Sequence, residues 1–75
     1  MDYSLKQVMN YFRNHGCEAK LVIKAGYNYV ELRRSYDRTV HTSSFPEQAN
    51  YTLDYVNKEA ITLNICTGIN GDRLC

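Results

Sequence analysis

Nine aromatic and basic side chains offer most of the binding chemistry in this chain. Tyrosine rings stack against flat groups and keep a hydroxyl for hydrogen bonds, whereas lysine and arginine attract phosphates and carboxylates. Seven tyrosines and no tryptophan make tyrosine the main aromatic contact residue. The candidate partner-binding residues are Lys20, Lys24, Tyr27, Tyr29, Arg33, Tyr36, His41, Tyr51 and Tyr55.

Catalytic chemistry, by contrast, has no recognisable pattern in the sequence. Covalent catalysis needs a nucleophile, a base and a group that orients the base. His15 and His41 are the only histidines, and no G-x-S-x-G turn presents a serine to either one. Four dispersed glycines form no phosphate-binding loop. We therefore expect a protein that is not an enzyme, with no catalytic residue and no cofactor.

The cysteines and the N-terminal segment indicate a reducing compartment. Cys17, Cys66 and Cys75 are an odd number without a C-x-x-C pair, a poor framework for disulfides or zinc. The first six residues lack the basic and apolar segments of a signal peptide, and no run approaches the about 18 apolar residues of a membrane span. We expect no disulfide, no metal and no membrane contact. The predicted location is the cytoplasm, or the host cytoplasm if a phage encodes the protein.

Length and composition predict one small globular domain. The chain has 75 residues, of which 44% are hydrophobic and 23% charged, and its net charge is +1. Residues 1–43 hold seven Lys/Arg against four Asp/Glu, and residues 44–75 hold two against four. This asymmetry is too mild to indicate bulk attraction to nucleic acid or membrane. We expect a single domain over residues 1–67 and a turn-rich tail over residues 68–75, which either closes a small hairpin or frays.

The binding residues need a sheet to position them, and three antiparallel strands are predicted at about 18–25, 28–34 and 38–43. Apolar and polar residues alternate there with the period of two that a half-buried strand requires. The predicted inner face carries Ala19, Leu21, Ile23, Val30, Leu32 and Val40. The opposite face carries Lys20, Lys24, Tyr27, Tyr29, Arg33 and His41. The third strand is the least apolar, which favours an edge position.

One helix is predicted on each side of these strands in the sequence. The first spans residues 3–15, with an apolar stripe of Leu5, Val8, Met9 and Phe12 and a capping box from Ser4 to Gln7. The second is predicted to begin at Ser44, with Pro46 in its first turn and Glu47 completing a capping box, and to continue to about residue 58. Its buried stripe is Ala49, Leu53, Val56 and Ala60.

The second half of the chain has two further expected features. Tyr51 and Tyr55 lie opposite the buried stripe of the second helix, so we expect their rings to face solvent or a partner. Residues 60–66 alternate between apolar and polar and predict a fourth strand, with continuation of the helix as the alternative.

These elements predict an α+β fold with the order α-β-β-β-α and an optional final strand. A small antiparallel sheet of three to four strands would carry two helices on one face and leave the other face open. The order resembles that of double-stranded-RNA-binding domains, in which the last helix starts with a lysine-rich segment. Residues 44–50 of this chain contain no base and one acid. The resemblance therefore implies an order of elements, and not RNA binding.

Three functions follow from these patterns. A non-enzymatic protein-binding module is the first prediction, because Tyr and Arg are enriched at interface hot spots. Small domains of this kind are typical of phage or mobile-element accessory proteins that bind and inhibit a host protein or defence complex, in an anti-CRISPR-like or anti-restriction-like role. The alternatives are an RNA- or DNA-binding domain that uses the basic, tyrosine-bearing sheet face, and a homo-oligomeric structural or regulatory protein, in the simplest case a homodimer.

Overall fold

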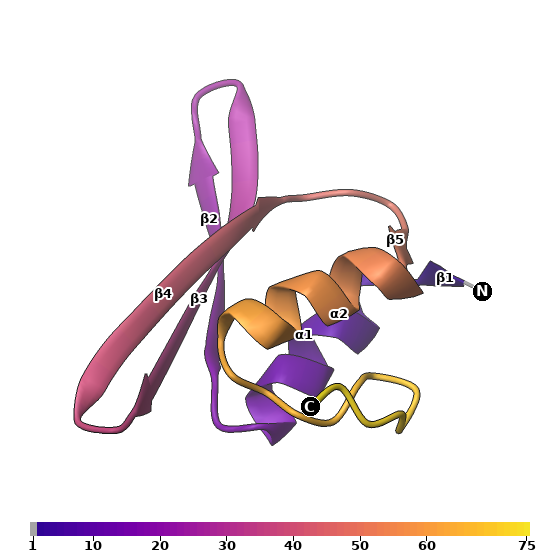
Figure 1. The fold of residues 1–75 in the computed structure, drawn as a ribbon. Helices are drawn as coiled ribbons and strands as arrows, with labels where there is room; N and C mark the ends of the chain where they lie inside the picture. The colour runs from indigo at the N-terminus through magenta and orange to yellow at the C-terminus, as the bar shows by residue number, and fades with distance from the viewer. Residues whose placement is uncertain (1) are drawn as a thin grey trace.

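The α+β architecture is confirmed by the computed structural model, which describes residues 2–75, so the first residue of the predicted domain lies outside it (Figure 1). Three strands form an antiparallel sheet in the order β2-β3-β4, and β1 pairs with β5 in a separate two-stranded sheet. Both helices lie on the same side of the three-stranded sheet (Figure 1). The elements are β1 (Asp2–Tyr3), α1 (Leu5–Asn14), β2 (Glu18–Lys24), β3 (Tyr27–Tyr36), β4 (Thr39–Pro46), β5 (Tyr51–Thr52) and α2 (Leu53–Thr62).

Helix α1 forms within the predicted range of residues 3–15 and for the predicted reasons, although Tyr3 belongs to β1 and the helix spans Leu5–Asn14. The Ser4 hydroxyl accepts a hydrogen bond from the Gln7 backbone N–H at 3.2 Å, and the Gln7 side chain accepts one from the Ser4 N–H at 2.8 Å. Val8 and Phe12 are fully buried. Tyr11 is buried as well, and its hydroxyl donates to the Thr67 carbonyl at 2.6 Å. The capping box therefore sets the start of this helix, and its apolar stripe attaches it to the core.

Strand β3 is shared by two hairpins that diverge. In Figure 1 the β2–β3 hairpin points upward and the β3–β4 hairpin points to the lower left. The turn after β2 uses Gly26 at φ 74°, which glycine adopts without strain. The turn after β3 places Asp37 and Arg38 at φ 53° and 61°, the left-handed pair that a two-residue hairpin of matching twist requires. Both hairpin tips extend beyond the helices.

The predicted burial of two apolar strand residues is wrong. Ile23 lies near the tip of the β2–β3 hairpin and is 73% exposed. Val40 is 48% exposed because β4 has the opposite phase from the one predicted. The strand continues to Pro46, and Phe45 is buried opposite Val30 in β3. Since side chains alternate, a buried Phe45 places Ser43 and His41 inward and Val40 outward.

The predicted start of the second helix is also wrong. Ser44 and Pro46 belong to β4. The N-cap of α2 is Thr52, eight residues after the predicted N-cap, and the helix begins at Leu53. The Thr52 hydroxyl accepts a hydrogen bond from the Tyr55 N–H at 3.2 Å. Ala49 is exposed, contrary to the prediction. The S-x-x-E pattern at Ser44 is typical of a capped helix start. In the structure β4 continues through this segment instead, and Phe45 is buried.

No fourth strand forms over residues 60–66, and the helical alternative is the correct one. Helix α2 runs to Thr62, and Ala60 is fully buried. The chain turns at Asn64, at φ 60°, and returns Ile65 to the core beside Leu63. Two of the alternating apolar residues over 60–66, Leu63 and Ile65, are therefore buried by the end of α2 and by the chain reversal that follows it.

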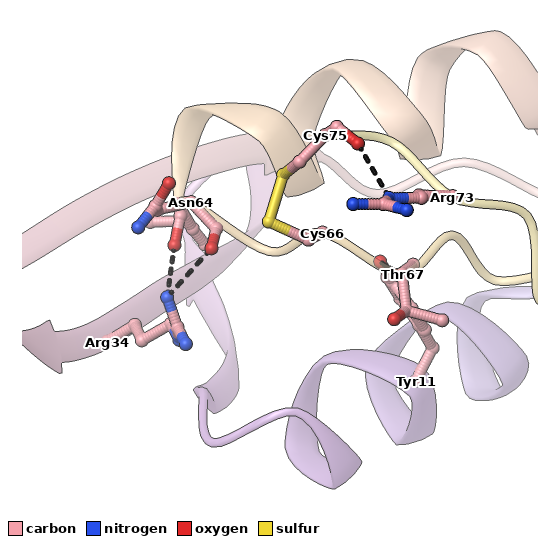
Figure 2. The surroundings of a disulfide bond; sticks show 8 residues. Tyr11, Arg34, Asn64, Cys66, Thr67, Arg73 and Cys75 are labelled. Carbon is pink, nitrogen blue, oxygen red and sulfur yellow. Dashed lines mark hydrogen bonds between the residues drawn. A yellow bond between two sulfur atoms is a disulfide. The ribbon is translucent and has the colours of Figure 1, made fainter.

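A disulfide between Cys66 and Cys75 corrects the prediction that the cysteines are unpaired (Figure 2). It closes a small C-terminal loop in which the Leu74 N–H donates to the Cys66 carbonyl at 2.7 Å. Ile69 and Leu74 pack against the core. Cys17 is free and buried. The pairing was not apparent from the spacing because it depends on the reversal of the chain between residues 68 and 72.

Candidate protein-binding surface

The face of the three-stranded sheet that points away from both helices is an uncovered surface on which several predicted binding residues meet. Strand alternation and the register of β2, β3 and β4 determine which side chains it carries. We call it the outer face. Its side chains are Glu18, Lys20, Val22, Lys24, Tyr27, Tyr29, Glu31, Arg33, Ser35, Val40, Thr42, Ser44 and Pro46.

Two tyrosines form the aromatic centre of the outer face. Tyr27 and Tyr29 stack with ring centroids 5.3 Å apart and an interplanar angle of 28°. The Lys24 ammonium lies 5.8 Å from the centre of the Tyr29 ring, within reach of a cation–π interaction. Tyr27 is 54% exposed. Because the rings already restrict each other, a partner that contacts them loses little side-chain entropy.

Most charges of the outer face are opposed across the strands. Lys20 in β2 lies opposite Glu31 in β3, and Glu18 lies opposite Arg33. Opposite charges at directly facing positions attract each other and reduce the field that reaches an approaching ligand. Lys24 is the cation of this face that has no acidic residue opposite it, since its register partner is Tyr27. The outer face therefore carries a net charge of only +1.

A shallow depression of about 570 Å³ lies on this face. It adds Val40 to the surface, an exposed apolar side chain that the sequence prediction placed in the core. Stacked rings, an apolar residue and hydroxyls in one shallow hollow suit contact with another protein surface. The lining residues are Tyr27, Tyr29, Glu31, Arg33, Val40, Thr42, Ser43 and Ser44.

Two predicted site residues lie on the other side of the sheet. Tyr36 and His41 stack at a centroid distance of 3.8 Å near the tip of the β3–β4 hairpin. The Arg34 guanidinium lies 5.0 Å from the centre of the Tyr36 ring and donates to the Leu63 carbonyl at 2.7 Å. Figure 2 shows Arg34 reaching from the sheet to the chain after α2. This cluster attaches the hairpin to the helical layer and is separate from the outer face.

Tyr51 and Tyr55 are not on an exposed helix face as predicted. Tyr51 is 1% exposed; its hydroxyl donates to the Pro46 carbonyl at 2.9 Å and accepts from the Gln48 N–H at 2.8 Å. Tyr55 is half-buried, with its ring 6.2 Å from that of Phe45. Burial, and secondarily the nearby Glu59 carboxylate, raise the pKa of Tyr55. Of the nine predicted residues, the outer face therefore brings together Lys20, Lys24, Tyr27, Tyr29 and Arg33.

The side chains that could act as nucleophiles or metal ligands are held in structural contacts or buried. Within residues 2–75, no three His, Cys, Asp or Glu side chains are grouped to hold a metal ion. The His15 ring contacts the Tyr11 carbonyl at 2.9 Å. Burial raises the pKa of the Cys17 thiol, which disfavours the reactive thiolate. None of the helices in this part of the chain is long and apolar enough to cross a membrane.

Comparison of the chain with protein-family models, with curated proteins and with solved structures gives no match. The geometry and charge of the outer face are therefore the features from which the function is inferred.

Proposed function

We propose that this protein is a non-enzymatic module that binds another protein through the outer face. The observation that supports this most directly is that opposite charges occupy facing positions of β2 and β3, which leaves stacked tyrosines and an exposed valine as the distinctive chemistry of the face. Aromatic side chains at the centre of an interface supply much of its binding energy. Phosphate recognition would instead favour an unopposed cluster of bases.

The finer role that we propose is stoichiometric inhibition. A phage or mobile-element accessory protein of this kind would bind a host protein or defence complex and cover the surface that its target needs. An inhibitor that covers a functional surface of its target needs a large contact area and a stable fold. A small domain with a stacked tyrosine pair on an open sheet face provides both. The proposed setting is the host cytoplasm, where the Cys66–Cys75 disulfide would have to persist under reducing conditions.

Affinity purification with the immobilised protein tests the proposal. We expect one dominant protein partner at a stoichiometric amount. Replacement of Tyr27 and Tyr29 by Ala should abolish its recovery, while the circular dichroism spectrum stays native. Tyr36→Ala is the matched control, because Tyr36 is a sheet tyrosine on the opposite face and its loss should leave recovery unchanged. Equal recovery by the double variant would disprove the surface assignment.

Nucleic-acid binding is the competing outcome. If Lys20, Lys24 and Arg33 bound phosphates, affinity for single- or double-stranded probes would fall steeply between about 50 and 200 mM salt. We expect no such binding in fluorescence anisotropy, because two of these three bases face acidic residues across the sheet. Tight, salt-sensitive binding that is lost on replacing these bases would favour the nucleic-acid function.

A further inference from the structure

Strand β4 has a free edge whose hydrogen-bonding groups can be assigned from its register. The two-residue turn makes Tyr36 and Thr39 a hydrogen-bonded pair, and such pairs alternate along an antiparallel ladder. A bond of 3.1 Å from the Glu47 N–H to the Asn28 carbonyl continues the same phase beyond the strand. The residues whose N–H and C=O groups then point away from β3 are Val40, Thr42 and Ser44.

This edge lacks the protection found on the other edge of the sheet. Strand β2 contains three charged residues in seven, and α1 packs beside it. Strand β4 contains no Lys, Arg, Asp or Glu from Thr39 to Pro46. Natural sheets usually carry charges or proline on exposed edges, since an unprotected edge pairs with other strands. The proline of β4 stands only at its end, where it limits the length of an added strand.

We propose that two copies of this chain form a homodimer by antiparallel pairing of their β4 edges around a two-fold axis at Thr42. Thr42 would face Thr42 of the second copy, and Val40 would face the second copy's Ser44. By symmetry, Ser44 would face the second copy's Val40. These three residue pairs would exchange two hydrogen bonds each, in the pattern of an antiparallel ladder. One residue pair further, Pro46 has no N–H to donate, so the ladder ends there.

The chemistry of the edge favours a second copy as the occupant. The facing residues are small or β-branched and uncharged, so the symmetric arrangement opposes no like charges. A symmetric pair is also self-complementary, because each copy supplies the same donors and acceptors. The dimer would join two outer faces into one six-stranded surface. It leaves Tyr27 and Tyr29 accessible and is therefore independent of the proposed partner binding.

Sedimentation equilibrium of the full chain tests the dimer. We expect a concentration-dependent monomer–dimer equilibrium for the wild type. Thr42→Pro removes one edge donor per copy without breaking a bond to β3, and should weaken association by about tenfold to a hundredfold. Thr42→Val is the matched control, because it keeps the backbone N–H and the branched shape, and it should associate like the wild type. A wild type that stays monomeric throughout the micromolar range would overturn the proposal.

A charge exchange at the two-fold axis tests the register. Thr42→Lys and Thr42→Glu place like charges opposite each other in their own dimers, so each variant alone should be more monomeric than the wild type. An equimolar mixture should recover the dimer, since Lys then faces Glu. The same exchange at Val22, in the opposite edge strand β2, should leave dimerisation unchanged. A dimer that Thr42→Pro leaves unchanged would contradict β4 pairing, and so would a dimer that the mixture does not restore. Occupation of the β4 edge by a different protein alone would also contradict it.

Discussion

Two tyrosine pairs of this protein have opposite environments. Tyr27 and Tyr29 stack on each other on the open side of the sheet, whereas Tyr51 lies in the core and Tyr55 partly covers it. The Tyr51 ring meets Phe45 edge to face at 5.2 Å, and its hydroxyl has two backbone partners. A buried tyrosine usually has a hydrogen-bond partner for its hydroxyl, as Tyr51 does.

The difference separates residues that stabilise the fold from residues available for binding. The outer-face pair has exposed surface and a neighbouring lysine, and no element lies over it. Tyr51 and Tyr55, the core pair, join β4 to α2. Substitution should therefore reduce stability at one pair and binding at the other, and the following predictions test this separation in order of decreasing effect.

Truncation of Tyr51 should have the largest effect on stability. Tyr51→Ala removes a fully buried ring and should lower the free energy of unfolding by about 3–5 kcal/mol. Tyr51→Phe keeps the ring but removes the hydroxyl that bonds the segment from Pro46 to Gln48, and should cost about 1–2 kcal/mol. Urea denaturation followed by circular dichroism measures both. Equal stability of Tyr51→Ala and the wild type would refute the core assignment.

Opening the disulfide should have the next largest effect. Cys66 and Cys75 are nine positions apart, and a loop of this length constrains the unfolded chain by about 2–3 kcal/mol. Reductant should therefore lower the denaturation midpoint of the wild type. The doubly substituted Cys66→Ser/Cys75→Ser variant serves as the control, since its midpoint should already be lower and should not respond to reductant. A wild-type midpoint that reductant leaves unchanged would argue against the disulfide.

Alkaline pH should destabilise the protein through Tyr11, which is buried like Tyr51. Burial, with a smaller effect of Cys17, raises the pKa of Tyr11 to about 12. Because the folded state favours the protonated hydroxyl, this contribution is fully present below the unfolded value of about 10 and is lost as the pH rises to about 12. Tyr11→Phe should be less stable at neutral pH and show a shallower decline over that range. Parallel declines for both proteins would exclude Tyr11 as a cause.

The outer-face pair should have the smallest effect on stability. Tyr27→Ala and Tyr29→Ala should each change the free energy of unfolding by less than about 1 kcal/mol, because little buried contact is lost. Thermal denaturation of the two variants measures this. A loss comparable to that of Tyr51→Ala would mean that the outer-face pair supports the core, and would remove the distinction between the pairs.

The sequence is sufficient to predict α1 and the three-stranded sheet, because each depends on local periodicity and local hydrogen-bonding signals. The Ser4 capping box and the alternation through Leu32 are examples. It also predicts the five outer-face residues that lie on β2 and β3, since the phase of both strands is set by their apolar residues.

The errors arise where long-range packing overrides a local pattern. Phe45 is buried by the sheet and by Tyr51, so β4 extends through a segment that contains a helix-start pattern. As a result, Val40 lies on the outer face and His41 on the opposite one, the reverse of the prediction. Cys66 meets Cys75 only because the chain reverses between residues 68 and 72. Local spacing contains none of this information.

The most direct test of the account is the dissociation constant of the purified partner for two forms of this protein, measured by titration calorimetry. The Tyr27→Ala/Tyr29→Ala variant should bind at least about a hundredfold more weakly than the wild type, with an unfolding midpoint close to that of the wild type. An unchanged dissociation constant for a natively folded double variant would contradict the assignment of the outer face as the binding surface.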